Sequence, residues 1–228
     1  RGEIAELQAQ ARLATAATSK ELQVRKAADV EVKRRVDMLK TTPKYAMLQF
    51  NPKLQGEFQL ANATNALMAV KSIENRLPLT ETAIQHGIAR ARVPGRFQEV
   101  RINPSLILDV AHNPQAAQSL SRNLRAHAVS GKTIAIFSIL RDKDILGVIQ
   151  ALSLDIDGWY IAEIQNERAA DLETISNAIQ KVNPSAHIVP FKNIKEAYEF
   201  GSKEVTSNDR IIVFGSFFTV TDIMKLIS

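Results

Sequence analysis

The second half of the chain alternates short apolar runs with longer amphipathic segments, and this alternation limits the possible folds more than any other feature. Runs that are apolar at almost every position are typical of strands buried on both faces, and the segments between them have helical periodicity. Strands and helices in alternation form a mostly parallel sheet with helices on both faces. We therefore predict a Rossmann-like α/β domain. The apolar runs are residues 105–110, 133–140, 158–162, 187–190 and 210–214, and the helical segments are residues 114–128, 145–152, 172–182, 194–205 and 219–227.

The first part of the chain is predicted to be a helical segment that precedes this domain. Residues 3–42 contain neither Gly nor Pro and are rich in residues of high helix propensity. Thr18 and Glu21 have the spacing of a capping box, which indicates a break between two helices there. The predicted domains are therefore residues 1–95 and residues 96–228. The remaining predicted elements of the first domain are a short strand over residues 45–50, a helix over residues 57–75, and a helix from Thr80 to the Pro94-Gly95 break.

Composition and charge disfavour nucleic-acid binding. The chain has 228 residues, of which 45% are hydrophobic and 23% are charged, as in ordinary globular proteins. The net charge of +5 is concentrated near the start, because residues 1–44 hold 10 Lys/Arg and 6 Asp/Glu, whereas residues 45–228 hold 19 and 18. The body of the chain therefore lacks the basic stripe that phosphate-backbone binding needs, and we expect no nucleic-acid partner.

The sequence also lacks cysteines and membrane signals. The absence of cysteine excludes disulfides, thiolate metal sites and a cysteine nucleophile. No apolar run approaches the roughly 20 residues of a membrane helix, and the first residues are too polar for a secretory signal. We expect no membrane partner and a cytoplasmic location, with an organelle matrix left open.

The loop after the first apolar run is the main candidate for chemistry, because ligands of doubly wound sheets bind at the carboxyl ends of the strands. Asp109 follows this run directly, and His112, Asn113 and Pro114 come next. Asn113 and Pro114 are also a good start for a helix, so the loop could be no more than a cap. His112 favours a site, since an imidazole beside a carboxylate suits substrate positioning or proton transfer. Both interpretations stay open at this point.

Two weaker candidates flank that loop in the chain. Gly215 and Ser216 follow the last apolar run, where they could form a turn and a helix cap or present helix N–H groups to an anion. Arg96 follows the Pro94-Gly95 turn, and its guanidinium suits phosphate, although a lone arginine is usually a solvated surface charge.

Several familiar motifs are excluded. Gly131-Lys132-Thr133 is not the end of a P-loop, because Ala126 stands where the motif needs glycine and the triplet precedes a strand. His86, His127 and His187 have no metal-ligand spacing. There is no Gly-x-Ser-x-Gly and no Gly-x-Gly-x-x-Gly motif. We interpret Asp142-Lys143-Asp144 as a solvated turn.

The order of these short motifs resembles the folylpolyglutamate synthase/dihydrofolate synthase family of the Mur ligase superfamily, over about residues 54–228. The strongest part is Pro-Gly-Arg-Phe followed by Asp-x-Ala-His-Asn-Pro. The motifs are Gly-Glu-Phe-Gln-Leu-Ala-Asn-Ala at residues 56–63, Pro-Gly-Arg-Phe-Gln at 94–98, Leu-Asp-Val-Ala-His-Asn-Pro at 108–114, Asp-Lys-Asp at 142–144 and Gly-Ser-Phe at 215–217.

The resemblance implies a reaction and a set of residue roles. ATP phosphorylates a carboxylate of dihydropteroate or folate, and the amine of L-glutamate then attacks the acyl phosphate. Arg96 is implied to contact phosphate, Asp109 the ribose and Asn62 the adenine. His112 and Ser216 are implied to bind glutamate, with His112 as the catalytic residue.

The chain departs from the family pattern in its first part. Members of the family begin with a P-loop domain that binds the triphosphate and supplies the ligands of Mg²⁺, and nothing in this sequence matches that domain. Residues 1–95 are interpreted as a remnant of the central ligase domain. We therefore expect the chain to be a fragment without ligase activity of its own. The alternatives are another Mur-superfamily amino-acid ligase, which the Phe-Gln after Pro-Gly-Arg disfavours, and a non-catalytic Rossmann-like binding module.

Overall fold

The computed structural model describes residues 59–91 and 93–228, together with residues 23, 27, 30, 31, 33–35 and 37, which have helical backbone. The helix predicted over residues 3–42 is confirmed at those eight positions. The break predicted at Thr18 to Glu21 and the strand predicted over residues 45–50 lie outside the described residues. The chain divides into two compact units, one that includes residues 59–91 and one that includes residues 93–228.

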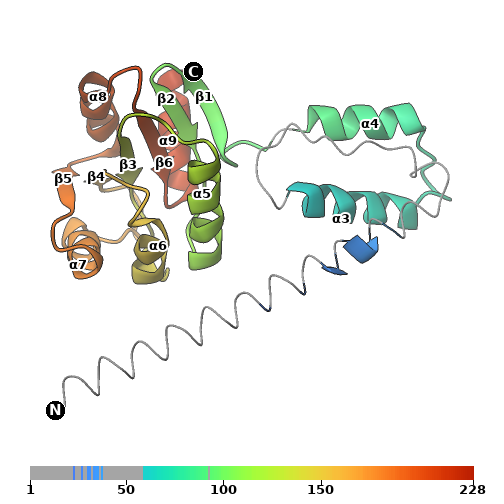
Figure 1. The fold of residues 1–228 in the computed structure, drawn as a ribbon, viewed down its shortest axis with the longest axis horizontal. Coiled ribbons are helices and arrows are strands. Elements are labelled where there is room, and N and C mark those ends of the chain that lie inside the picture. The colour runs from blue at the N-terminus through green and yellow to red at the C-terminus, as the bar shows by residue number, and fades with distance from the viewer. Residues whose placement is uncertain are drawn as a thin grey trace, which may run out of the picture. The chain divides into compact units, whose positions relative to one another are not determined.

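Residues 59–91 of the first unit form two short helices, which are drawn in cyan to green in Figure 1. They are α3, Gln59–Ser72, and α4, Glu81–Arg90. Helix α4 begins one residue after the predicted start at Thr80, because the Thr80 hydroxyl caps it by accepting a hydrogen bond from the Ala83 N–H at 3.1 Å. Leu67 of α3 and Ile84 of α4 are the buried residues of this small core.

The second unit is a six-stranded sheet, and it confirms the predicted α/β class. In order across the sheet the strands are β1 (Gln98–Ile102), β2 (Ser105–Leu108), β6 (Arg210–Phe214), β3 (Thr133–Phe137), β4 (Gly158–Ala162) and β5 (His187–Phe191). Strands β2, β6, β3, β4 and β5 are parallel, and β1 pairs antiparallel with β2. Because β2, β6 and β3 are parallel neighbours, the loops that follow them share one edge of the sheet.

Helices cover both faces of the sheet, as Figure 1 shows. Along β6 the buried side chains alternate between two cores: Ile212 and Phe214 face one, and Ile211 and Val213 face the other. The first core contains residues of α5 (Pro114–Ala126), α6 (Ile145–Leu152) and α7 (Leu172–Val182), and the second contains residues of α8 (Ile194–Glu204) and α9 (Phe217–Ile227). The loops after β2 and β3 therefore lead to one face, while the loop after β6 leads to the other.

The structure corrects the sequence prediction at the start of this unit. Strand β1 was not predicted, because three of the five residues of Gln98–Ile102 are polar and the segment lacks the continuous apolar character of the other strands. It forms a hairpin with β2 through a turn that contains the cis Asn103–Pro104 bond. Strand β2 ends two residues earlier than predicted, since the backbone N–H of Val110 donates to the Gly95 carbonyl and so leaves the ladder.

Candidate functional site

The carboxyl ends of β2, β6 and β3 carry most of the candidate residues. Asp109, at the end of β2, is the most buried of the charged ones, with 8% of its surface exposed. One carboxylate oxygen accepts the Phe97 N–H and the other accepts the Ala111 N–H, each at 2.8 Å. Asp109 therefore joins the turn before β1 to the loop after β2. Each of its oxygens keeps a lone pair, but the side chain already has a structural function.

Burial dominates the electrostatics of Asp109. Desolvation raises the pKa of this carboxyl above its ordinary value, and hydrogen bonds from Phe97 and Ala111 and the positive charge of Arg96 offset part of that rise. The positive charge of Arg96 thus acts on Asp109. The two predicted nucleotide-binding residues therefore lie at the same end of β2.

The turn that presents Arg96 has an unusual backbone. Gly95 has a φ of 68°, and a side chain there would lie 2.8 Å from Val110. Phe97 has a φ of 44°, which is rare for a residue other than glycine and is stabilised here by its bond to Asp109. Arg96 between them is exposed, and among the described residues its guanidinium has no hydrogen-bond partner. The turn therefore holds an accessible cation in a defined place.

His112 has one ring nitrogen fixed and one open. Its Nδ1 lies 2.7 Å from the Val110 carbonyl oxygen, which can only accept, so Nδ1 carries the proton. In the neutral ring, Nε2 is then an acceptor. The ring centroid lies 6.2 Å from that of Phe217 at the start of α9, so the loops after β2 and β6 are in contact.

Ser216 caps α9, and its hydroxyl is fully engaged. Its Oγ accepts the Thr219 N–H at 3.0 Å and lies 2.7 Å from the Thr219 hydroxyl. The Thr219 hydroxyl donates to the Ser138 carbonyl, so the Ser216 hydroxyl must be the donor of the 2.7 Å bond. Ser216 therefore has no hydrogen to offer a glutamate carboxylate. The N–H groups in the first turn of α9 remain as donors for an anion.

The helix after β2 and the helix after β3 begin close together. Asn113 caps α5 by accepting the Ala116 N–H at 2.9 Å, and Pro114 is its first residue, as predicted. Asp144 caps α6 in the same way through the Gly147 N–H. A side chain at Gly147 would lie 2.7 Å from Pro114, so the two helix starts are packed against each other.

Asp142-Lys143-Asp144 forms the turn that was predicted, with an ion pair that was not. Arg168 donates to both carboxylate oxygens of Asp142 at 2.8 Å, and Lys143 lies 3.1 Å from one of them. The Arg168 and Lys143 contacts lower the pKa of Asp142. Arg168 was missed because nothing in the local sequence around it indicates a partner 26 residues away.

The predicted site residues thus fall into two groups. Arg96, Asp109 and His112 lie at the end of β2, and the contact between His112 and Phe217 brings the Ser216 loop beside them. Asn62 lies in α3 of the other unit, where its amide donates to Gln59 at 3.2 Å. Its predicted contact with adenine stays a prediction.

Neither a metal site nor a membrane-spanning helix is found among the described residues. Among the residues that the structure describes, no group of three or more His, Cys, Asp or Glu side chains could hold a metal ion. In the same part of the chain, no helix is both long enough and apolar enough to cross a membrane.

The parallel sheet and the loops at its carboxyl edge define a class of protein. Comparison with known families identifies that class. Residues 95–217 match the family described as the Mur ligase, glutamate ligase domain, and the chain belongs to that family. Within it, the resemblance drawn from the motifs is confirmed. The chain is 36% identical over 166 residues to the dihydrofolate synthase/folylpolyglutamate synthase of Escherichia coli, a match that covers 73% of this chain and 37% of that protein.

Solved structures of folylpolyglutamate synthases are also similar to this chain. FolC of Escherichia coli in complex with DHPP and ADP superposes with a TM-score of 0.67 at 33% identity, covering 79% of this chain and 40% of that one. Mycobacterium tuberculosis folylpolyglutamate synthase complexed with ADP gives 0.67 at 27% identity, covering 78% and 41%. The chain therefore spans about two fifths of the length of the relatives that it matches.

Proposed function

We propose that residues 93–228 form the nucleotide- and glutamate-binding half of an ATP-dependent ligase that adds L-glutamate to dihydropteroate or folate. The observation that carries the proposal is the carboxyl edge of the sheet, where Asp109 fixes both the Arg96 turn and the His112 loop. Membership of the glutamate ligase domain family supports it, as do the names of the relatives.

Arg96 is the residue we assign to phosphate. Its guanidinium is exposed and has five N–H donors in a planar fork, which suits the oxygens of a transferring phosphoryl group. In the reaction, the γ-phosphoryl group of ATP passes to the substrate carboxylate, giving an acyl phosphate and ADP. A fixed cation would stabilise the charge that spreads over the phosphoryl oxygens.

His112 is the residue we assign to the glutamate amine. Its Nδ1–H is bound to the Val110 carbonyl, so Nε2 of the neutral ring can accept a hydrogen bond from that amine. The amine attacks the carbonyl carbon of the acyl phosphate, phosphate leaves, and the amine loses a proton as the amide forms. His112 would orient the amine and take this proton.

The first turn of α9 is the part we assign to a glutamate carboxylate. Ser216 donates its only hydroxyl hydrogen within the fold, so it would act by capping the helix and not by donating to the substrate. The helix N–H groups and the positive end of the helix dipole would bind the carboxylate instead.

Asp109 has a structural role first in this proposal, whereas the resemblance implied a contact with ribose. Both of its oxygens accept backbone N–H groups, so holding the Arg96 turn is its first function. A contact with ribose through a remaining lone pair stays a prediction.

We assign no Mg²⁺ ligand to the described residues. Among them, no group of three or more His, Cys, Asp or Glu side chains could hold a metal ion, and the family resemblance implies that the Mg²⁺ ligands lie in the P-loop domain. No step is therefore assigned to Mg²⁺ in this unit. A location in the cytoplasm likewise stays a prediction.

A non-catalytic binding module is the second candidate, and one observation favours it. Asp109 and Ser216 both make hydrogen bonds that the fold itself needs, so an idle domain would also keep them. The two candidates differ at Arg96, which the fold does not need.

Calorimetric titration of the chain with ATP distinguishes them. We expect saturable binding that is weakened about tenfold in Arg96→Ala, because one charge-assisted contact is lost. Lys181→Ala, at an exposed residue in the last turn of α7, removes the same charge and should bind ATP as the unsubstituted chain does. Equal affinity in the two variants, or no binding at millimolar ATP, would favour the non-catalytic module.

A further inference from the structure

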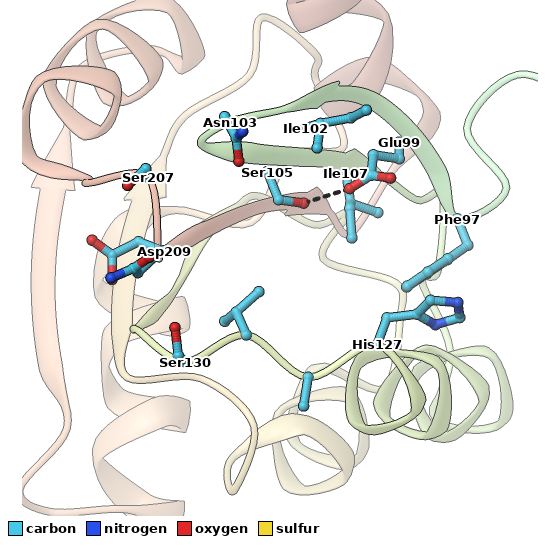
Figure 2. Close-up of a pocket in the computed structure, with 13 residues that line it drawn as sticks. Phe97, Glu99, Ile102, Asn103, Ser105, Ile107, His127, Ser130, Ser207 and Asp209 are labelled. Atoms are coloured by element: carbon cyan, nitrogen blue, oxygen red, sulfur yellow. Dashed lines mark hydrogen bonds between the residues drawn. The ribbon is translucent and has the colours of Figure 1, made fainter.

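A cleft of about 300 Å³ lies in the second unit, between the β1–β2 hairpin and the loops that precede β3 and β6. Figure 2 shows it with Phe97 and His127 at one end and Ser207 and Asp209 at the other. We call it the hairpin cleft. None of the residues assigned above to ATP or glutamate lines it, and its volume matches the lower end of the range for small-molecule sites.

The charged side chains that line the hairpin cleft are both acidic. They are Glu99 and Asp209, and no Lys or Arg is among the lining residues. The backbone N–H groups of Thr206 and Lys132 lower the pKa of Asp209, so it keeps its charge. The Ser105 hydroxyl donates to Oε1 of Glu99 at 2.9 Å, which holds this exposed carboxylate by one oxygen and leaves Oε2 available to a ligand.

The remaining walls are aromatic and aliphatic. The rings of Phe97 and His127 lie 5.3 Å apart at 44°, and Nδ1 of His127 is bound to the Asn123 carbonyl oxygen, so its neutral ring presents Nε2 as an acceptor. Ile107 forms part of the floor, and Ile102 at the rim is 73% exposed, which is unusual for an isoleucine.

Two arginines lie near the hairpin cleft without lining it: Arg210, which is buried and whose positive charge acts on Glu99, and Arg101, which is half-buried in β1. Arg210 is 4% exposed and donates to the carbonyls of Leu124 and His127 at the end of α5. Arg101 donates to the Pro104 carbonyl. The unpaired nitrogens of both arginines have almost no exposed surface, so a ligand in the cleft would meet the carboxylates and not these guanidinium groups.

We propose that the hairpin cleft binds a small organic cation, an ammonium group attached to a flat or branched apolar group. The ammonium would bind Oε2 of Glu99, with the ring faces of Phe97 and His127 beside it, and the apolar part would cover Ile102 and Ile107. This site is separate from the proposed ligase function and does not depend on it. It shares Phe97 with the candidate site, since the N–H of that residue donates to Asp109 while its ring lines the cleft.

The test uses the full chain with labelled isoleucine methyl groups and three probes of similar size: benzylammonium, benzyl alcohol, which has the same shape as benzylammonium, and benzoate. Benzylammonium should shift the methyl signals of Ile102 and Ile107 in a saturable way and leave Ile175 of α7 unchanged. Benzyl alcohol should bind at least about tenfold more weakly, because it lacks the charge-assisted hydrogen bond. Benzoate should not shift these signals.

Two matched variants complete the test. Glu99→Gln keeps an oxygen that can accept the Ser105 hydroxyl, and it should lower the affinity for benzylammonium to that for benzyl alcohol. Glu163→Gln makes the same charge change at an exposed residue that does not line the cleft, and it should have no effect. The other methyl signals report whether each variant is folded. The proposal is overturned if benzylammonium causes no saturable shift, if benzyl alcohol or benzoate binds as tightly, or if Glu99→Gln leaves the affinity unchanged.

Discussion

At the scale of single residues, Asp109 has a structural function in the candidate site, whether or not its remaining lone pairs bind a ligand. It accepts two backbone N–H groups that are otherwise buried, one on each side of the site. An unpaired buried N–H group costs about 1–3 kcal/mol, so a residue in this place contributes to stability whether or not a nucleotide binds.

Asp109→Ala should therefore destabilise the fold. The variant leaves the N–H groups of Phe97 and Ala111 without acceptors, while it also removes a desolvated carboxylate, which offsets part of the loss. We expect the free energy of unfolding in urea to fall by about 1–3 kcal/mol. Asp142→Ala is the control, because Asp142 is exposed and makes only surface ion pairs. A change in Asp142→Ala as large as that in Asp109→Ala would contradict this account.

The pKa of Asp109 predicts a direction for the pH dependence. Burial raises this pKa above the ordinary 3.8, so the folded protein binds the proton more tightly than the unfolded chain does. The contribution of Asp109 to stability is then complete below pH 3.8 and declines as the pH rises through the raised pKa. Asp109→Asn cannot titrate, so the stability of the unsubstituted chain relative to this variant should fall across that window. Urea unfolding at a series of pH values measures it, and a relative stability that rises across the window would show the sign to be wrong.

At the scale of elements, the strongly patterned segments could be predicted from the sequence to the residue. The bounds of α6, α7, β4 and β6 match, because each has continuous apolar or clearly periodic residues and a polar residue or glycine at its limits. Helix α9 begins at Phe217, two residues before the predicted start, because Ser216 caps it. For the candidate site, the sequence placed Asp109, His112 and Ser216 in loops at the carboxyl edge, and Arg96 only in a turn before the α/β domain.

The interactions that shape the site could not be predicted, because they join residues far apart in the chain. The bond from Phe97 to Asp109 spans 12 residues, and the one from Thr219 to Ser138 spans 81. Helix and strand periodicity describe neighbours within an element and contain no information about such pairs. For this reason the sequence indicated that Ser216 could be a ligand or a cap, and only the geometry shows where its hydrogen goes.

A substitution at Gly215 tests the geometry of the β6–α9 loop. Its φ is 109°, and a Cβ there would lie 2.3 Å from the Ser138 carbonyl oxygen and 2.7 Å from the Phe137 ring. Gly215→Ala should therefore destabilise α9 by at least about 2 kcal/mol, through backbone strain and the clash together. Amide hydrogen exchange in α9 measures this change.

Gly87 is the matched control for that substitution. Nothing lies within 4 Å of a Cβ placed there, and the residue is inside α4. Gly87→Ala should stabilise α4 by about 0.5–1 kcal/mol, because alanine loses less conformational entropy in a helix. Destabilisation at Gly87, or an unchanged α9 in Gly215→Ala, would be inconsistent with the described backbone.

At the scale of the whole molecule, the chain contains a glutamate ligase domain and spans about two fifths of the length of its relatives. The family match begins at residue 95 and ends at residue 217, within the second compact unit. That unit has an exposed cation, an imidazole with one open nitrogen and a helix start on one edge, and its described residues have no metal cluster. These features suit the binding and orientation of ATP and L-glutamate that we propose for this unit.

The most direct measurement of the central claim is an amide NMR titration of the chain with ATP and then with L-glutamate. We expect ATP to cause saturable shifts in the amides of residues 94–97 and 109–113, and glutamate to extend them to residues 215–218. Amides at the opposite edge of the sheet, where the strands begin, should not respond. Saturable shifts at that opposite edge alone, or no shift in these three loops at millimolar ligand, would contradict the assignment of this edge as the nucleotide and glutamate site.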